Sequence, residues 1–164
     1  MRGLFWLLCA MTTSACAMST SSQAGSLADS ATVRPAGSLR VVKVVARIAI
    51  ADGALFRGGW RWGVAGDESG ADSVITEMSV TVDHRECLVP RSVYADLADP
   101  TSIKISRTVR GFEIVICGGQ EATYYRARTQ WRGGLVRERW VRGAAFPDEA
   151  WEHTLYGWVP LDGR

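Results

Sequence analysis

Hydrophobic and polar side chains alternate along residues 73–83 of the chain. One set of alternate positions contains Met78 and Val80, whereas the other contains Glu77 and Thr81. A repeat of two residues places successive side chains on opposite faces of an extended strand, so that one face meets a core and the other meets water. This segment therefore predicts a β-strand in a sheet with one solvated face.

Further segments have the β-branched and aromatic composition of strands and are separated by turn signals. The predicted strands cover residues 39–50, 54–65, 73–83, 86–89, 103–107, 112–117, 122–131 and 135–142. Residues 90–100 predict one short helix or a structured loop, with Ser92 as a helix N-cap. Many short strands favour a mainly β fold, which we expect to be a single antiparallel β-sandwich or barrel-like domain.

Two Gly-Gly pairs divide residues 108–142 into the three strands of an antiparallel meander. Glycine adopts the positive φ angles that tight hairpin turns require. We therefore expect two-residue turns at Gly118-Gly119 and at Gly133-Gly134. The turn at Gly133-Gly134 fixes which residues of the second hairpin face each other.

That turn gathers arginines on one side of the predicted hairpin. Arg128 lies directly across from Arg139 and Gln130 lies across from Arg137, with Glu113 close enough to neutralise part of the charge. Like charges that face each other across a sheet are destabilising by up to roughly 1 kcal/mol, so an anionic partner would stabilise them. The alternative is a solvated face without a ligand. The candidate binding face consists of Tyr124, Arg126, Arg128, Arg137 and Arg139.

The start of the chain has the organisation of an export signal. Met1-Arg2 is a short positive region, residues 3–11 are apolar, and small residues precede Cys16. The apolar stretch is about half the roughly 20 residues of a membrane-spanning helix, so we expect membrane contact through a lipid anchor only. The predicted organisation is a signal peptide at 1–15, a lipidated Cys16 with a flexible linker at 16–38, and a β domain at 39–164.

The segment Thr13-Ser14-Ala15-Cys16 resembles the lipobox of bacterial lipoproteins, although a lipobox usually has leucine where this chain has Thr13. The resemblance implies lipidation of Cys16. Ala17 after the cysteine resembles the pattern of lipoproteins sorted to the outer membrane, which implies a protein that faces the periplasm. Ala15-Cys16-Ala17 also fits ordinary signal peptidase, and that cleavage would give a soluble periplasmic or secreted protein that begins at Met18.

Cys87 and Cys117 are the two cysteines that remain in the predicted β domain. Because exported domains fold in an oxidising compartment, we expect one disulfide between them. Closing that loop would stabilise the domain by about 3–4 kcal/mol in the chain-entropy model. The alternative is two independent buried thiols. No second Cys or His lies at ligand spacing from either residue, so we expect no metal site.

The composition, with 47% hydrophobic and 22% charged residues among 164, fits one globular domain with short appendages. The 17 arginines against 2 lysines are compatible with anion binding and equally with a GC-rich genome. Loss of Arg2 with the signal leaves 18 of the 19 basic residues against 17 acidic ones. This balance argues against nucleic acid as the partner.

The segments VPRSVYADLADP and GGQEATYYRAR, at residues 89–100 and 118–128, resemble stretches of small exported bacterial proteins that have no assigned activity. The resemblance covers about a third of the chain. It implies location and fold, and it assigns no functional residue.

Catalytic motifs are absent from the sequence, and we expect no cofactor. The histidines, His84 and His153, lie in segments without a nucleophile elbow, a metalloprotease helix or a phosphate-binding loop. A carboxylate pair such as Glu77 with Glu113 stays open as the basis of a cell-wall or glycan-acting hydrolase. The sequence favours an envelope-anchored module that binds or inhibits an acidic protein or a glycan in the periplasm. We expect this module not to be an enzyme.

The export signal generates the first prediction. We expect mass spectrometry of membrane fractions to find an acylated cysteine at position 16 as the N-terminus, because the small residues before Cys16 fit the lipidation pathway. Cys16→Ser should release the protein from the membrane fraction. A wild-type protein that begins at Met18 and stays soluble would contradict lipidation.

Overall fold

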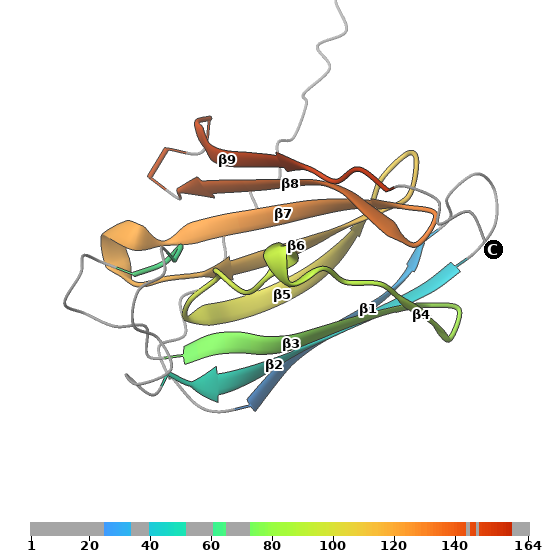
Figure 1. Ribbon diagram of the computed structural model, residues 1–164, viewed down its shortest axis with the longest axis horizontal. Coiled ribbons are helices and arrows are strands. Elements are labelled where there is room, and N and C mark those ends of the chain that lie inside the picture. Colours follow the sequence, from blue (N-terminus) through green and yellow to red (C-terminus); the bar gives the residue numbers. More distant parts are fainter. Residues whose placement is uncertain are drawn as a thin grey trace, which may run out of the picture.

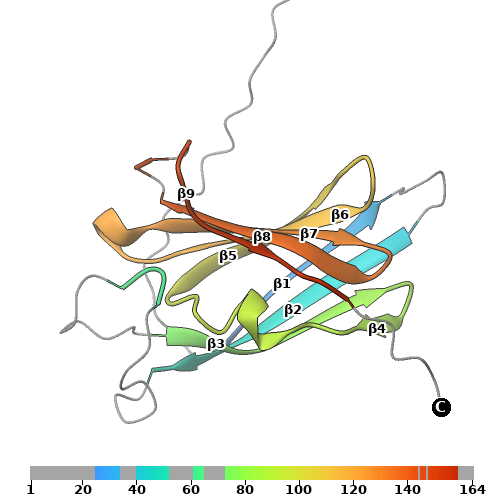
Figure 2. The ribbon, with the colours of Figure 1, turned by 45° about the horizontal axis from the view of Figure 1, so that its top comes forward.

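Two antiparallel sheets make up the part of the chain that a computed structural model describes, which comprises residues 25–33, 40–51, 61–64, 73–143, 145–146 and 148–158. The first sheet contains β1 (Gly25–Val33), β2 (Arg40–Ile50), β3 (Ser73–Val82) and β4 (Arg85–Cys87), in that order. The second contains β5 (Pro100–Arg107), β6 (Phe112–Gly118), β7 (Tyr125–Arg132), β8 (Leu135–Gly143) and β9 (Ala150–Leu155), also in chain order. Figures 1 and 2 show the sheets as two packed layers. The predicted β-sandwich is confirmed.

Alternating burial along the strands places the core between the two sheets. In β2, Val42 and Val44 are fully buried, whereas Val41 and Val45 face outward and are partly exposed. From the second sheet, Ile114 and the other inward side chains meet this layer. The largest fully buried side chains are Trp131, Tyr125, Leu97, Ile114 and Ile116. The alternation that predicted strands in the sequence is thus the alternation between core and solvent.

β1 corrects the predicted flexible linker over residues 16–38. Residues 25–33 pair with β2 along their whole length, although only Leu27, Ala31 and Val33 supply apolar side chains to the core. The strand is stable in this place because it completes the sheet and packs along β5. The linker interpretation failed because polar inward positions conceal the strand period.

Asp29 joins the two sheets where β1 runs beside β5. Its Oδ2 atom accepts a hydrogen bond of 2.6 Å from the backbone N–H of Ile105 in β5. The side chain of a strand in one sheet thereby satisfies a backbone donor at the edge of the other sheet. An edge N–H that is already bonded cannot recruit another strand.

The hairpin turns agree with the sequence at one Gly-Gly pair and differ at the other. Gly133 and Gly134 form the expected two-residue turn, with φ of 62° and 77°. The connection from β6 to β7 is longer than predicted, because it includes a 3₁₀ turn at Glu121–Thr123 and Gly118 pairs with Tyr125. A Cβ atom on Gly118 would lie 2.5 Å from the hydroxyl of Tyr125, so this glycine is needed for close packing.

A β-bulge on β8 corrects the predicted register of the second hairpin. Trp131 pairs with Val136 as expected, but Gln130 pairs with Glu138, so Arg137 is an additional residue. From Arg139 onward the pairing is shifted by one position: Arg139 lies opposite Thr129 and not opposite Arg128. A shift of one residue moves each side chain to the other face of the strand.

The structure does not show the predicted disulfide, because no bond joins Cys87 and Cys117. Cys87 ends β4 and packs against the core, where burial followed by the charge of Glu86 raises the pKa of its thiol. Cys117 pairs with Arg126 and faces out of the second sheet. Cys117 therefore lies in the row of Arg126 on the outer side of the second sheet, whereas Cys87 packs against the core from the first sheet.

The remaining predicted segments agree in part or lie outside the described residues. Residues 90–100 contain a single 3₁₀ turn at Arg91–Val93, which takes the place of the expected short helix. The signal peptide, Cys16 and most of the predicted strand at 54–65 fall outside the described ranges. Among the described residues, no helix is long and apolar enough to cross a membrane.

The contact between the sheets generates a stability prediction. Asp29→Ala should lower the free energy of unfolding by about 1–3 kcal/mol, because the backbone N–H of Ile105 loses its acceptor in a partly buried place. Urea denaturation measures the change. Ser30→Ala, an exposed neighbour on the same strand, is the control and should change stability by less than about 0.5 kcal/mol. Equal effects of the two variants would refute a special role for Asp29.

Candidate functional site

The outer face of the five-stranded sheet carries its charges in ordered rows. The strand registers place the outward side chains of neighbouring strands next to one another. The first row is Ser102, Cys117, Arg126, Arg142 and Ala150. The second row is Lys104, Val115, Arg128, Trp140 and His153. The third row is Ser106, Glu113, Gln130, Glu138 and Leu155. Basic groups therefore lie in the first two rows and acidic groups in the third.

Arg126 and Arg142 are the arginines that face each other across strands. They form a directly opposed pair on β7 and β8, and Arg126 is exposed. Within the described part of the chain, no side chain forms a hydrogen bond or an ion pair with Arg126. Two opposed guanidinium groups repel each other and provide parallel N–H donors for a carboxylate or phosphate.

Arg128 occupies a different environment from Arg126, although both belong to the predicted binding face. Its Nε atom lies 2.6 Å from Oε2 of Glu113, which satisfies its charge within the sheet. Its guanidinium carbon also lies 5.3 Å from the centre of the Trp140 ring. The expected neutralisation by Glu113 is therefore present, and it is directed at Arg128.

Trp140 stands between two side chains from the neighbouring strands. Arg128 on β7 lies against one side of the indole, and His153 on β9 stacks on the other at 4.9 Å and 9°. The histidine Nε2 lies 3.4 Å from Oε2 of Glu138. Both neighbours lie close to the indole and so leave less of the ring open for a sugar to stack on.

Arg139 is a correction to the predicted binding face, because its side chain is only 3% exposed and points into the sandwich. Its two terminal nitrogens bond to Asp96 at 2.7 Å and to Glu152 at 2.8 Å. The bulge at Arg137 is the cause, because the shifted register sends Arg139 to the inner face. Arg137 itself is exposed, and Tyr124 is half-buried in the connection that precedes β7.

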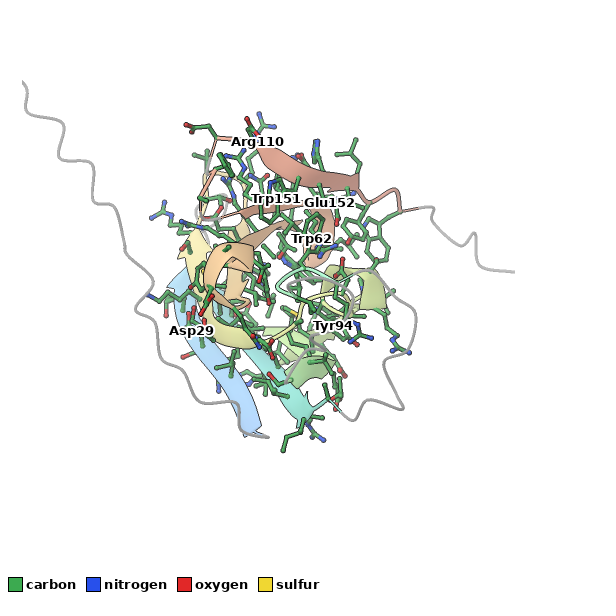
Figure 3. All side chains as sticks on the ribbon, turned by 90° about the vertical axis from the view of Figure 1, so that its left-hand side faces the viewer. Asp29, Trp62, Tyr94, Arg110, Trp151 and Glu152 are labelled. Carbon is green, nitrogen blue, oxygen red and sulfur yellow. The ribbon has the colours of Figure 1, made fainter. Side chains whose placement is uncertain are left out.

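A polar cluster surrounds the buried arginine and joins four segments of the chain. Glu152 on β9 accepts hydrogen bonds from the indole N–H of Trp62 at 3.0 Å and from the hydroxyl of Thr154 at 2.6 Å. Trp62 also stacks on Trp151 at 5.4 Å. Figure 3 shows Trp62 below Trp151 and Glu152, at the end of the sandwich. Arg139 therefore holds β8, β9, the Trp62 segment and the loop at Asp96 together.

A second polar group lies at the same end of the fold. Asp99 is buried and accepts hydrogen bonds from the backbone N–H of Ser73 at 2.6 Å and from the side-chain amide of Gln120 at 2.9 Å. Tyr125 is fully buried, and burial followed by the charge of Asp99 raises the pKa of its phenol well above the ordinary value. Neighbouring Arg61 has a lowered pKa because of burial, which the charge of Asp96 opposes. Asp99 thus serves hydrogen bonding in the fold, and Tyr125 serves packing.

Sequence reasoning missed Asp96 and Glu152, and the signal for them was indirect. A predicted repulsion between Arg128 and Arg139 was unfavourable in itself, which favours any register that separates them. Neither carboxylate belongs to a motif with Arg139, since 43 residues separate Arg139 from Asp96. The pairing follows from the tertiary fold alone.

The carboxylate pair considered for a hydrolase does not assemble. Glu77 forms an ion pair with Arg47 at 3.3 Å on the four-stranded sheet, whereas Glu113 pairs with Arg128 on the other sheet. His84 lies in the turn after β3 with a φ of 65°, far in the chain from His153 on β9. Within the described ranges, no group of three or more His, Cys, Asp or Glu side chains is arranged to hold a metal ion.

Comparisons with known proteins add no relative to this picture. No family model, no curated protein and no solved structure matches the chain.

The buried arginine generates a prediction that reverses the expectation for an exposed one. Arg139→Glu should destabilise the fold by about 3 kcal/mol or more, because a third carboxylate would replace the cation between Asp96 and Glu152. Denaturation curves measure the change. Arg137→Glu is the matched control two residues away, and its exposed side chain should leave stability within about 0.5 kcal/mol. A neutral Arg139→Glu variant would refute the shifted register.

Proposed function

We propose that this protein is an envelope-anchored lipoprotein whose β-sandwich binds an acidic protein in the periplasm. The binding surface is the basic part of the outer face, formed by Arg126 and Arg142, with Lys104 in the neighbouring row on the far side of β6. The observation that carries the proposal is Arg126, which is exposed, lies directly opposite Arg142 and forms no ion pair with a described side chain. An anionic group at Arg126 would offset the repulsion between the two guanidinium groups. The export signal and the resemblance to a lipobox support the location.

The distribution of charge supports an extended acidic surface as the partner. Basic residues lie in two neighbouring rows, and the acidic residues Glu113 and Glu138 lie together in the third row. A partner with carboxylates over the first rows and without them over the third would match both halves. Such complementarity orients a partner and speeds its association.

The covered indole of Trp140 favours a protein over a glycan. Sugar-binding surfaces use an exposed aromatic face, whereas Arg128 and His153 lie against the two faces of this ring. Arginine side chains suit the carboxylates of aspartate and glutamate, which they bind through parallel hydrogen bonds.

The proposed surface generates a prediction in which stability and binding change in opposite directions. Arg126→Glu should leave the free energy of unfolding unchanged or raise it by a few tenths of a kcal/mol, because it replaces a repulsion with an attraction to Arg142. The same change should weaken an acidic partner by about 1.5–3 kcal/mol. The measurements are denaturation curves and the retention of partner from envelope extract in a salt series.

Lys43→Glu is the control, because it changes the net charge equally on the exposed face of the other sheet. It should retain the partner at the wild-type level. Equal retention by wild type and Arg126→Glu would refute the surface. A retained ligand that survives protease treatment and contains carbohydrate would show that the partner class is wrong.

A further inference from the structure

The edges of the two sheets differ in how they are protected against pairing with another strand. β1 and β5 run beside each other, and Asp29 bonds to the edge N–H of Ile105. β4 is only three residues long and is soon followed by Pro90. Short strands, prolines and covered edges are the usual means of preventing edge association. Three of the four edges thus have an identifiable protection.

β9 is the fourth edge, and in the described part of the chain it is neither short nor covered, although a bulge at Trp151 interrupts its pairing with β8 and the charged Glu152 points inward. It has six residues without proline or lysine, and β8 is the strand with which it pairs. Figure 1 shows β9 at the border of the upper sheet. Its outward side chains include Trp151 and Leu155, which are 38% and 70% exposed.

The hydrogen bonds of β9 show which backbone groups point away from β8. The N–H of Tyr156 bonds to the carbonyl of Arg137, one position beyond the pair of Leu155 with Glu138. Inward and outward groups alternate along an antiparallel edge strand. The backbone groups of Thr154 and Tyr156 therefore bond to β8, whereas those of His153 and Leu155 point to the free edge.

We propose that β9 pairs with β9 of a second copy of this chain, in an antiparallel arrangement whose twofold axis passes at His153. In this register His153 lies opposite its own copy, and Trp151 lies opposite Leu155 of the second copy. His153 and Leu155 are residues whose backbone groups point to the free edge, whereas Trp151 lies in the bulge of β9 and contributes an exposed side chain. The two five-stranded sheets become one continuous sheet, which is an isologous interface.

Both the apolar and the charged groups of β9 support a second copy of the chain as the partner of this edge. The twofold axis brings Trp151 and Leu155 together twice, so each covers the other's exposed surface. The outer face is basic at the Ala150 end of β9, beside Arg142, and acidic at the Leu155 end, beside Glu138. Antiparallel pairing places the basic end of each copy next to the acidic end of the other. The paired faces would also present two copies of the Arg126 and Arg142 surface on one side.

Disulfide trapping on the full-length chain in its own membrane tests the pairing. His153→Cys places two thiols opposite each other, and the Cα separation of a hydrogen-bonded antiparallel pair, about 5.5 Å, lies within the range that a disulfide spans. A mild oxidant should convert most of the protein into a covalent dimer. Val109→Cys is the control, since Val109 is 92% exposed and lies on a loop away from the edge, and it should cross-link at least about tenfold less.

A proline on the same strand separates loss of pairing from loss of fold. Proline is tolerated on an edge strand where the missing N–H would face solvent, as the N–H of Leu155 does. Leu155→Pro in the His153→Cys background should therefore keep the wild-type circular dichroism spectrum and lose the cross-link. Cross-linking of His153→Cys at the level of the Val109→Cys control would overturn the proposal, and so would full cross-linking in the presence of Leu155→Pro. Binding by the Arg126 surface is measured separately, so failure of one proposal leaves the other intact.

Discussion

The ion pairs of Arg139 with Asp96 and Glu152 determine how the end of the sandwich is assembled. Removing a guanidinium group from water costs several kcal/mol, and this cost is offset only when its donors meet acceptors in good geometry. Here each acceptor comes from a different segment, one from the loop before β5 and one from β9. The arginine thereby fixes the position of both segments against β8. Loss of Arg139 would leave both carboxylates without their shared cation, whereas loss of one carboxylate would leave one terminal nitrogen of Arg139 without its acceptor.

The bulge on β8 connects this buried cluster with the outer surface. One additional residue, Arg137, changes the face on which Arg139 lies and brings Trp140 beside Arg128. Without the bulge, Arg139 would stand opposite Arg128 on the solvated side. The bulge therefore removes one repulsion from the surface, turns Arg139 inward as the cation of the core, and leaves Arg126 opposite Arg142. Bulges are expected where a side chain has to be redirected.

Strand positions could be predicted from the sequence wherever the apolar period is clear, as in β2, β3 and β6. β1 escaped because Asp29 occupies an inward position that an apolar residue would normally fill, and its acceptor role toward Ile105 depends on a strand far along the chain. The turn at Gly133-Gly134 could be predicted from its glycines, but the bulge three residues later has no local signal. The disulfide could not be settled from the sequence, because sequence fixes the face of each cysteine within its own strand and not the distance between strands.

The arginines lie in different environments, and for this reason their number alone does not predict an anion-binding site. Arg139 is paired in the core, Arg128 is paired with Glu113 and covers Trp140, and Arg126 stands opposite another arginine. Arg126 is exposed and forms no ion pair with a described side chain, whereas Arg128 and Arg139 have carboxylates within the fold. An anionic partner gains most at a cation that the fold has not already neutralised. Arg126 is therefore the place where a change of charge should separate recognition from stability.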